Sequence, residues 1–389
     1  MIEAPTLEQF ALNAEQKAIH ELAISFGQER IAPHALEWDQ QRHFPIETIK
    51  SAAPLGMGGI CVAEDVGGSQ LSRLDAVLIF EGLARACPCI AAYFTVHNMV
   101  ALIVDRFGNA EQRKKWVPRL CRFELLGAYC LSEPGTGSDA SHLATRAARK
   151  GDGYVLNGVK QFISGAGAAD LYIVWARTGG DGAHGISAFV VEKGTAGLSF
   201  GPCEKKMGWH AQPTRQVVLE NVLVPACHRL SAEGEGFRIA MSALDGGRLN
   251  IAACSLGGAR NALQKACTYM AERRAFGKTL AELEALQFRV ADMTTQLEVA
   301  ETFLWRAASA LEAKDPRATT LCAMAKRFVT DAGFQVANEA LQLFGGYGYL
   351  AEYGIEKLVR DLRVHQILEG TNEIMRVIIA RNCFPKAAG

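Results

Sequence analysis

The chain has 389 residues with 41 basic and 41 acidic side chains, so its formal net charge is zero. This balance gives no electrostatic case for binding nucleic acid or an anionic membrane surface. The composition is 49% hydrophobic, which is typical of a globular chain, and no stretch approaches the roughly 18–20 apolar residues of a membrane span. Disordered, collagen-like and transmembrane classes are thereby excluded, and the length predicts two or three domains.

The first third of the chain, residues 1–123, has the pattern of a helical domain. Asn13 is a good N-cap for a helix running towards Ile31, and Pro33 ends that helix. Ser72 precedes a second helix whose apolar residues share one face. Further apolar helical runs cover residues 90–107 and 109–121.

The residue composition changes over residues 124–233 and predicts a β domain. Gly and Thr become frequent, and short β-branched runs alternate with turns such as Gly151-Asp152-Gly153. Their lengths are those of strands. The predicted strands lie at 125–131, 154–159, 171–176, 186–191 and 216–224.

Helical periodicity returns in residues 234–389. Apolar residues recur at three- and four-residue steps through 288–311, Asp315-Pro316 breaks that helix, and Gly345-Gly346 ends the next one. These helices are long enough to pack as an antiparallel bundle. The fold class is therefore α+β multidomain, with the order helical domain, β domain, helical domain.

Several cofactor and metal motifs fail on inspection. Residues 135–140 fit G-x-G-x-x-A, but strands rather than a helix follow, so a dinucleotide fold is rejected. Gly277-Lys278-Thr279 lacks the first glycine of a phosphate loop, because residue 272 is Glu272. The histidines are isolated, so no metal is expected. The 11 cysteines form no C-x-x-C pair, which favours ordinary buried thiols in a reducing compartment.

The N-terminus shows neither a signal peptide nor a transit-peptide composition. The sequence therefore predicts a soluble intracellular protein. The expected location is a bacterial cytoplasm, or a mitochondrial matrix for a protein whose presequence has been removed.

Two segments of the β domain could bind a ligand. Residues 129–139 run from a strand into a loop rich in hydroxyls and glycines, which allows close ligand approach. In residues 160–167, Phe162 and Ser164 share one strand face, so a flat ligand could stack on the ring and bond to the hydroxyl. An ordinary β-turn and an ordinary strand end explain these patterns equally well.

Two segments of the last domain carry charged chemistry. Arg273 and Arg274 at a helix end suit a pyrophosphate, although a solvated helix C-terminus is a common alternative. Glu369 follows two apolar residues at a junction between helices, with Thr371 or Asn372 capping the next helix. Partial desolvation there would raise the carboxylate pKa towards that of a useful base, whereas most such residues are solvated.

Taken together, these four segments resemble the acyl-CoA dehydrogenase family along essentially the whole chain, with residues 129–138 and 360–373 matching its two signature motifs. The resemblance implies an N-terminal helical domain, a middle β-barrel-like domain and a C-terminal four-helix bundle, with FAD between them. It also implies a homotetramer that passes electrons to electron-transfer flavoprotein. Segments 81–84, 208–214, 246–248 and 364–373 look most like family members that convert isobutyryl-CoA to methacrylyl-CoA in valine catabolism.

The resemblance also implies roles for individual residues. Glu369 matches the usual catalytic base, since the alternative position used by some members is Gly247 here. Ser138 would meet both cofactor and substrate, and Arg273 would come from a neighbouring subunit. The other substrate-binding positions are Asp245, Gly246, Gly247, Arg248 and Arg381. The FAD-binding positions are Tyr129, Cys130, Leu131, Ser132, Gly137, Ser138, Phe162, Ile163, Ser164, Arg273, Phe276, Gln342, Leu343, Phe344, Gly345, Gly346, Thr371, Asn372 and Glu373.

The expected activity is therefore α,β-dehydrogenation of a short branched acyl-CoA, in which Glu369 removes the α-proton. Two departures from the family pattern bear on this expectation. Leu283-Glu284 stands where Gln often holds the adenosine end of FAD, and Leu368 replaces the Tyr of straight-chain members. 2-Methylbutyryl-CoA and butyryl-CoA are the alternative substrates. The alternatives from other classes are a flavin monooxygenase on the same fold and a flavin- or CoA-binding interaction protein.

Overall fold

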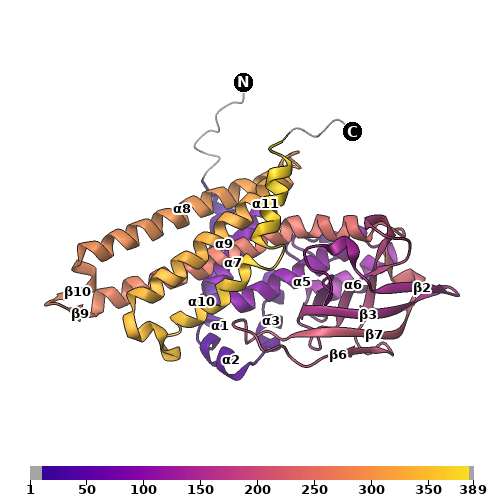
Figure 1. Ribbon diagram of the computed structural model, residues 1–389, viewed down its shortest axis with the longest axis horizontal. Coiled ribbons are helices and arrows are strands. Elements are labelled where there is room, and N and C mark those ends of the chain that lie inside the picture. The colour runs from indigo at the N-terminus through magenta and orange to yellow at the C-terminus, as the bar shows by residue number, and fades with distance from the viewer. Residues whose placement is uncertain (1–10, 385–389) are drawn as a thin grey trace.

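The computed structural model describes residues 11–384 and shows two helical regions with a sheet between them in the sequence. Figure 1 shows an elongated molecule with the sheet at one end and a small hairpin, β9-β10, at the other. The long helix α7 (Gly236–Glu272) runs from the hairpin to the sheet, and α8 (Glu284–Glu312) and α9 (Ala318–Leu343) pack beside it. The three-part architecture predicted from the sequence is confirmed.

Side-chain caps fix the starts of the first helices. Asn13 forms a capping box with Gln16, and Ser72 forms one with Asp75, as the residues at these positions predict. A third capping box, at Asn109, begins the last helix of the region. The helices are α1 (Ala14–Arg30), α2 (Ala35–Gln41), α3 (Ile46–Lys50), α4 (Arg73–Ala84), α5 (Pro88–Phe107) and α6 (Ala110–Cys121).

Helix α5 is apolar on nearly all sides because it lies in the core. By length and composition it could cross a membrane, but 83% of its most apolar window is buried inside the protein. The expectation that no stretch approaches that length is therefore wrong for this helix. Its burial identifies it as a core helix.

The middle region is an eight-stranded sheet ordered β6-β7-β3-β2-β4-β5-β8, with β1 parallel to β4. Strands β2 and β4 pair only through Arg146 and Arg177, so the sheet consists of two halves that meet at one corner. Every residue of β4 is buried, which places this strand at the centre of the β region. The strands are β1 (Gly127–Cys130), β2 (Arg146–Lys150), β3 (Gly153–Ser164), β4 (Leu171–Arg177), β5 (Ile186–Glu192), β6 (Leu198–Phe200), β7 (Thr214–Pro225) and β8 (Arg229–Leu230).

The C-terminal region is built on α7, which packs against helices of both helical regions. Its approach to α4 is close because Gly257 has no side chain: a Cβ there would lie 2.2 Å from the carbonyl oxygen of Glu81. A large hydrophobic cluster runs through the N-terminal helices, the sheet and this bundle, and a second cluster lies between α5, α6, β4, β5 and the start of α7. The elements are α7 (Gly236–Glu272), β9 (Arg274–Ala275), β10 (Lys278–Thr279), α8 (Glu284–Glu312), α9 (Ala318–Leu343), α10 (Ile355–Arg363) and α11 (Asn372–Arg381).

The cysteines are all free thiols, but not all of them are buried as expected. Cys203, Cys227 and Cys383 are exposed, because they lie at the surface in a loop, a short 3-10 helix and the turn after α11. Within residues 11–384, no group of three His, Cys, Asp or Glu side chains could hold a metal ion.

Candidate active site

A cavity of about 410 Å³ lies where the sheet meets the two helical regions. This volume is in the range of small-molecule sites in proteins. The structure brings together here many of the residues singled out in the sequence. They are Tyr129, Leu131, Ser132, Gly137, Ser138, Phe162, Ile163, Ser164, Arg248, Glu369 and Arg381.

The end of β3 presents an aromatic ring to this cavity. A register shift between Lys160 and Ile163 bulges the strand, and Phe162 takes a left-handed conformation with φ of 59°. Its side chain is 67% exposed although it is apolar, while Ile163 is buried in the core. An exposed ring beside the hydroxyl of Ser164 is a suitable surface for stacking a flat conjugated ligand.

Glu369 enters the cavity from the loop between α10 and α11. Its φ is 56°, and the next residue, Gly370, has φ of 87°, so two successive residues turn left-handed. The carboxylate oxygen Oε2 is buried and has no hydrogen-bond partner among the described residues. Burial raises the pKa of Glu369 to about 7, against the opposing charges of Arg248 and Lys326.

Helix α7 leaves room for this carboxylate. A Cβ on Gly247 would lie 2.5 Å from Oε2 of Glu369, so only glycine fits without displacing it.

The adjacent Arg248 donates from Nη1 to Oδ1 of Asp245 at 2.5 Å. Thr319 donates to the other oxygen of Asp245 at 2.7 Å. The guanidinium beside the cavity is therefore held by a carboxylate that is itself anchored.

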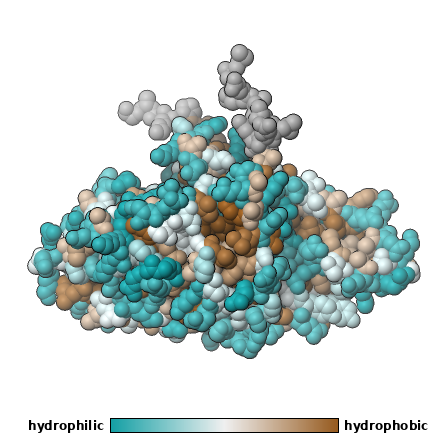
Figure 2. Space-filling model, turned by 180° about the vertical axis from the view of Figure 1, so that it is seen from behind, coloured by the Kyte–Doolittle hydropathy of each residue, from teal (hydrophilic) through white to brown (hydrophobic). Residues whose placement is uncertain are grey.

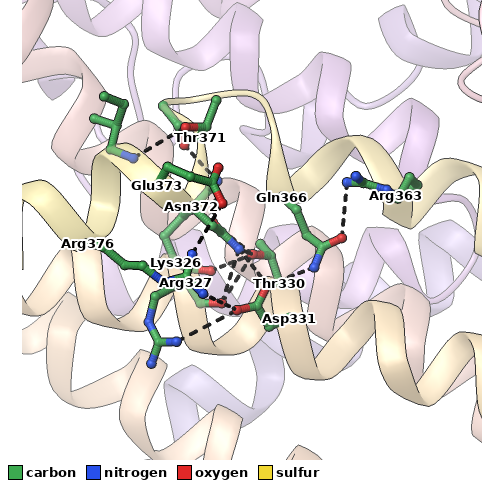
Figure 3. A network of polar contacts seen from close by, with 12 residues as sticks. Lys326, Arg327, Thr330, Asp331, Arg363, Gln366, Thr371, Asn372, Glu373 and Arg376 are labelled. Atoms are coloured by element: carbon green, nitrogen blue, oxygen red, sulfur yellow. Dashed lines mark hydrogen bonds and ion pairs between the residues drawn. The ribbon is translucent and has the colours of Figure 1, made fainter. Parts of the chain in front are cut away.

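The loop after Glu369 is tied to α9 by polar side chains, which Figure 3 shows at close range. Lys326 is fully buried and donates to the carbonyl oxygen of Gly370 at 2.8 Å. Sequence reasoning missed Lys326. The available signal was its position: it shares the buried face of α9 with Cys322, Val329 and Thr330, where a lysine is unusual.

A second cavity, of about 430 Å³, lies at the other end of α7. Tyr269 stacks on Phe344 with ring centroids 4.3 Å apart, and the Arg273 guanidinium lies 5.3 Å from the ring centroid of Tyr347. The predicted residues that line it are Arg273, Gln342, Leu343, Phe344, Gly345 and Gly346.

The two cavities lie far apart within one chain. Arg248 lines the first cavity from α7, and Arg273 lines the second just after the end of this helix. The 25 residues from one to the other span about 37 Å, at about 1.5 Å per residue of α-helix. Phe276 does not line the second cavity: it lies in the turn between β9 and β10 and is 94% exposed. Figure 1 shows this hairpin at the end of the molecule away from the sheet.

Gly246 faces Arg73 rather than the first cavity, and the side chains of four further predicted residues do not line that cavity either. Cys130 is buried in the hydrophobic core. Thr371 caps α11 through its hydroxyl, and Asn372 is buried in the network of Figure 3. Glu373 is exposed and pairs with Arg376 at 3.4 Å. The cavity also has lining residues that the sequence did not reveal: Thr95, Met99, Phe237, Met241, Leu244, Ile251 and Ile374.

Comparisons with known proteins match the full length of this arrangement. Residues 13–124, 128–222 and 234–384 match family models described as the N-terminal, middle and C-terminal domains of acyl-CoA dehydrogenase.

Two relatives and one solved structure are similar along nearly the whole chain. Mitochondrial isobutyryl-CoA dehydrogenase of Bos taurus is 51% identical over 95% of this chain and 89% of its own. The Dictyostelium discoideum protein of the same name is 50% identical over the same shares. The structure of butyryl-CoA dehydrogenase from Megasphaera elsdenii is 39% identical, with a TM-score of 0.93 over 96% of this chain and 99% of that one.

Proposed function

The chain belongs to the acyl-CoA dehydrogenase family and is an FAD-dependent oxidoreductase that dehydrogenates an acyl-CoA; from this premise we propose that isobutyryl-CoA is its substrate and methacrylyl-CoA its product. Valine catabolism is the corresponding pathway. The alternatives are 2-methylbutyryl-CoA and butyryl-CoA. The division of the chain at 123/124 and 233/234 is part of the same proposal.

One observation carries the reaction: a carboxylate oxygen of Glu369 is buried in the cavity and unpartnered. A carboxylate whose pKa is raised to about 7 is a stronger base than an ordinary glutamate and is still ionised at neutral pH in a substantial fraction of molecules. Glu369 would take the α-proton of an acyl chain bound in this cavity. As the family resemblance implies, the backbone N–H of Glu369 would donate to the thioester oxygen, on which negative charge develops during the reaction.

The residues present fit FAD. Phe162, Ser164 and Tyr129 offer an aromatic and hydroxyl-lined wall, and the indole Nε1 of Trp209, in the same wall, is buried with no partner among the described residues. These residues would hold the ring system beside Glu369. When bound, FAD supplies the acceptor for the hydride that leaves the β-carbon.

The distance between the two cavities supports a homotetramer. Arg273, Phe276 and 342–346 would hold the pyrophosphate and adenosine end of a cofactor whose ring system lies in another subunit. Figure 2 shows apolar surface gathered in the middle of the face opposite to that of Figure 1, which is suitable for covering by a second copy. Electron-transfer flavoprotein is the proposed acceptor of the electrons.

Branched substrate specificity would come from the apolar wall. Leu368 stands directly before Glu369, and Met99, Leu244 and Ile251 line the same cavity. Leucine fills less space than tyrosine and cannot form a hydrogen bond, so a short branched acyl group can lie beside it. Both mitochondrial relatives are named for isobutyryl-CoA. A bacterial cytoplasm and a mitochondrial matrix are the proposed locations.

Anaerobic titration of the FAD-loaded protein with four thioesters tests this function. We expect isobutyryl-CoA to bleach the flavin absorbance at the lowest concentration. 2-Methylbutyryl- and butyryl-CoA should require more, because a methylene or a branch position changes binding by about 1–3 kcal/mol. The fourth thioester is isovaleryl-CoA. The proposal would be contradicted if none of the four thioesters bleached the flavin. Rapid oxygen consumption by the reduced protein would then favour a monooxygenase.

The pH dependence of flavin reduction gives a second test. Glu369 acts as a base only when ionised, so the rate at saturating isobutyryl-CoA should rise with pH through about 7 and level off above it. Stopped-flow measurement of flavin bleaching across the neutral range checks this. A rate already constant well below neutral pH would contradict the raised pKa.

A further inference from the structure

A buried lysine on α9 contacts the loop that carries Glu369. Lys326 Nζ donates to the carbonyl oxygen of Gly370 at 2.8 Å and to Oδ1 of Asn372 at 2.9 Å. Its side chain has no exposed surface, and burying an ammonium group in a protein interior is costly unless it is paired and hydrogen-bonded. Both acceptors lie within three residues of Glu369.

The same helix holds both ends of the loop. At the exit, Asn372 donates from Nδ2 to Oδ1 of Asp331 at 2.7 Å and to Thr330 Oγ1 at 3.0 Å. At the entry, Gln366 donates to the same oxygen of Asp331 at 2.7 Å. Figure 3 shows these side chains converging on one stretch of α9, so the loop between Gln366 and Asn372 is anchored at both ends.

The loop needs this anchoring because its backbone conformation is unfavourable. Glu369 has a side chain and a φ of 56°, a region that residues with a Cβ rarely adopt. Such conformations persist where the surroundings over-determine them. The bond from Lys326 to the Gly370 carbonyl acts on the residue directly after Glu369. It therefore restrains the turn that aims the carboxylate.

Charge adds to this restraint. The cations that act on Glu369 are Arg248 from α7 and Lys326 from α9, and both favour its ionised form. Burial lowers the pKa of Lys326 itself to about 7; the carboxylates of Glu369, Asp331 and Glu373 oppose this shift, and the charge of Arg248 adds to it. The phenol of Tyr129 on β1 is subject to the charge of Glu369 as well.

We propose that Lys326 is a positioning residue for the base. It holds the left-handed turn at Glu369 and Gly370 through two hydrogen bonds, which its amine can donate in either protonation state, and its protonated form favours the ionised carboxylate. This inference rests on the proposed function, because it assigns Lys326 a role only if Glu369 is the base.

Two substitutions separate the hydrogen bonds from the charge. Lys326→Met removes both and is close to lysine in volume, whereas Lys326→Gln removes the charge but retains two N–H donors. Lys17→Met on the exposed face of α1 is the matched control for loss of a lysine. For each variant we would measure bound FAD per chain, KM and kcat for isobutyryl-CoA, and the pH midpoint of flavin reduction.

We expect Lys326→Met to retain FAD and to have a KM for isobutyryl-CoA similar to that of the wild type. Its kcat should fall by about 10- to 100-fold, because small misplacement of a reacting group has effects of this size. Lys326→Gln should recover part of that loss. Both should shift the midpoint of flavin reduction upward, by about one pH unit at most, since the positive charge that Lys326 carries when protonated is gone. Lys17→Met should match the wild type.

An unchanged kcat and midpoint in Lys326→Met, with an active wild type, would overturn this inference alone. So would equal losses of kcat in both variants with no change of midpoint, since that is the result of a purely structural role. An inactive wild type would instead overturn the proposed function. Should Lys326→Met fail to retain FAD, the midpoint of Lys326→Gln decides the question. Adding Lys326→Met to Glu369→Gln should reduce the rate little further, because the lysine acts through the carboxylate.

Discussion

Glu369→Gln is expected to abolish most of the activity and leave the cofactor in place. The substitution keeps the size of the side chain but removes the basic oxygen that would accept the α-proton. General-base catalysis contributes about 10²- to 10⁴-fold, so kcat for isobutyryl-CoA should fall by that factor. Flavin absorbance of the purified variant and stopped-flow reduction by substrate measure the two effects separately.

The matched control is Glu21→Gln, at an exposed position of α1, which makes the same chemical change away from the cavity. It should retain full activity. Removal of the buried charge should also help Glu369→Gln to fold, because an amide at this position costs less to bury than a carboxylate. Near-normal turnover of Glu369→Gln would refute the assignment of the base.

Local sequence signals predicted the elements of the fold because those signals act over a few residues. Asn13 and Ser72 mark helix starts through their own side chains, and the structure shows both capping boxes. The hydroxyl of Thr371 caps α11 by accepting from the backbone N–H of Ile374. Strands β6, β8, β9 and β10 were not predicted, because β6 has three residues and the others two, which is too short to show a periodicity.

The arrangement of the site was less predictable, because it depends on contacts between distant segments. The sequence identified Phe162 and Glu369 separately, but the cavity that both line is formed only when β3 and the loop before α11 meet. The left-handed turn at Glu369 breaks the usual preference for glycine, so no residue type signals it. Lys326 interacts with a loop 44 residues away in sequence, which helical periodicity cannot reveal.

Gly247 shows how a residue without functional groups can determine the position of the base. The sequence analysis placed it among the substrate-binding positions and identified it as the residue that stands where some family members carry the carboxylate. In the structure it lies within a buried part of α7 and faces the carboxylate of Glu369. The carboxylate can therefore keep its place in the cavity only if this position carries no side chain.

Gly247→Ala should accordingly impair activity more than stability. Alanine favours a helix interior over glycine by about 1 kcal/mol, so α7 itself gains. The added Cβ would lie 2.5 Å from Oε2 of Glu369, and the simplest relief is movement of that carboxylate. Misplacement of a reacting group by about 1 Å can cost on the order of 100-fold in rate, which is the loss of kcat we expect.

Gly180→Ala, where a Cβ meets nothing within 4 Å, is the control and should be fully active. Thermal unfolding and kcat measured on both variants would decide. A Gly247→Ala enzyme with wild-type kcat would show that the base does not need its observed position.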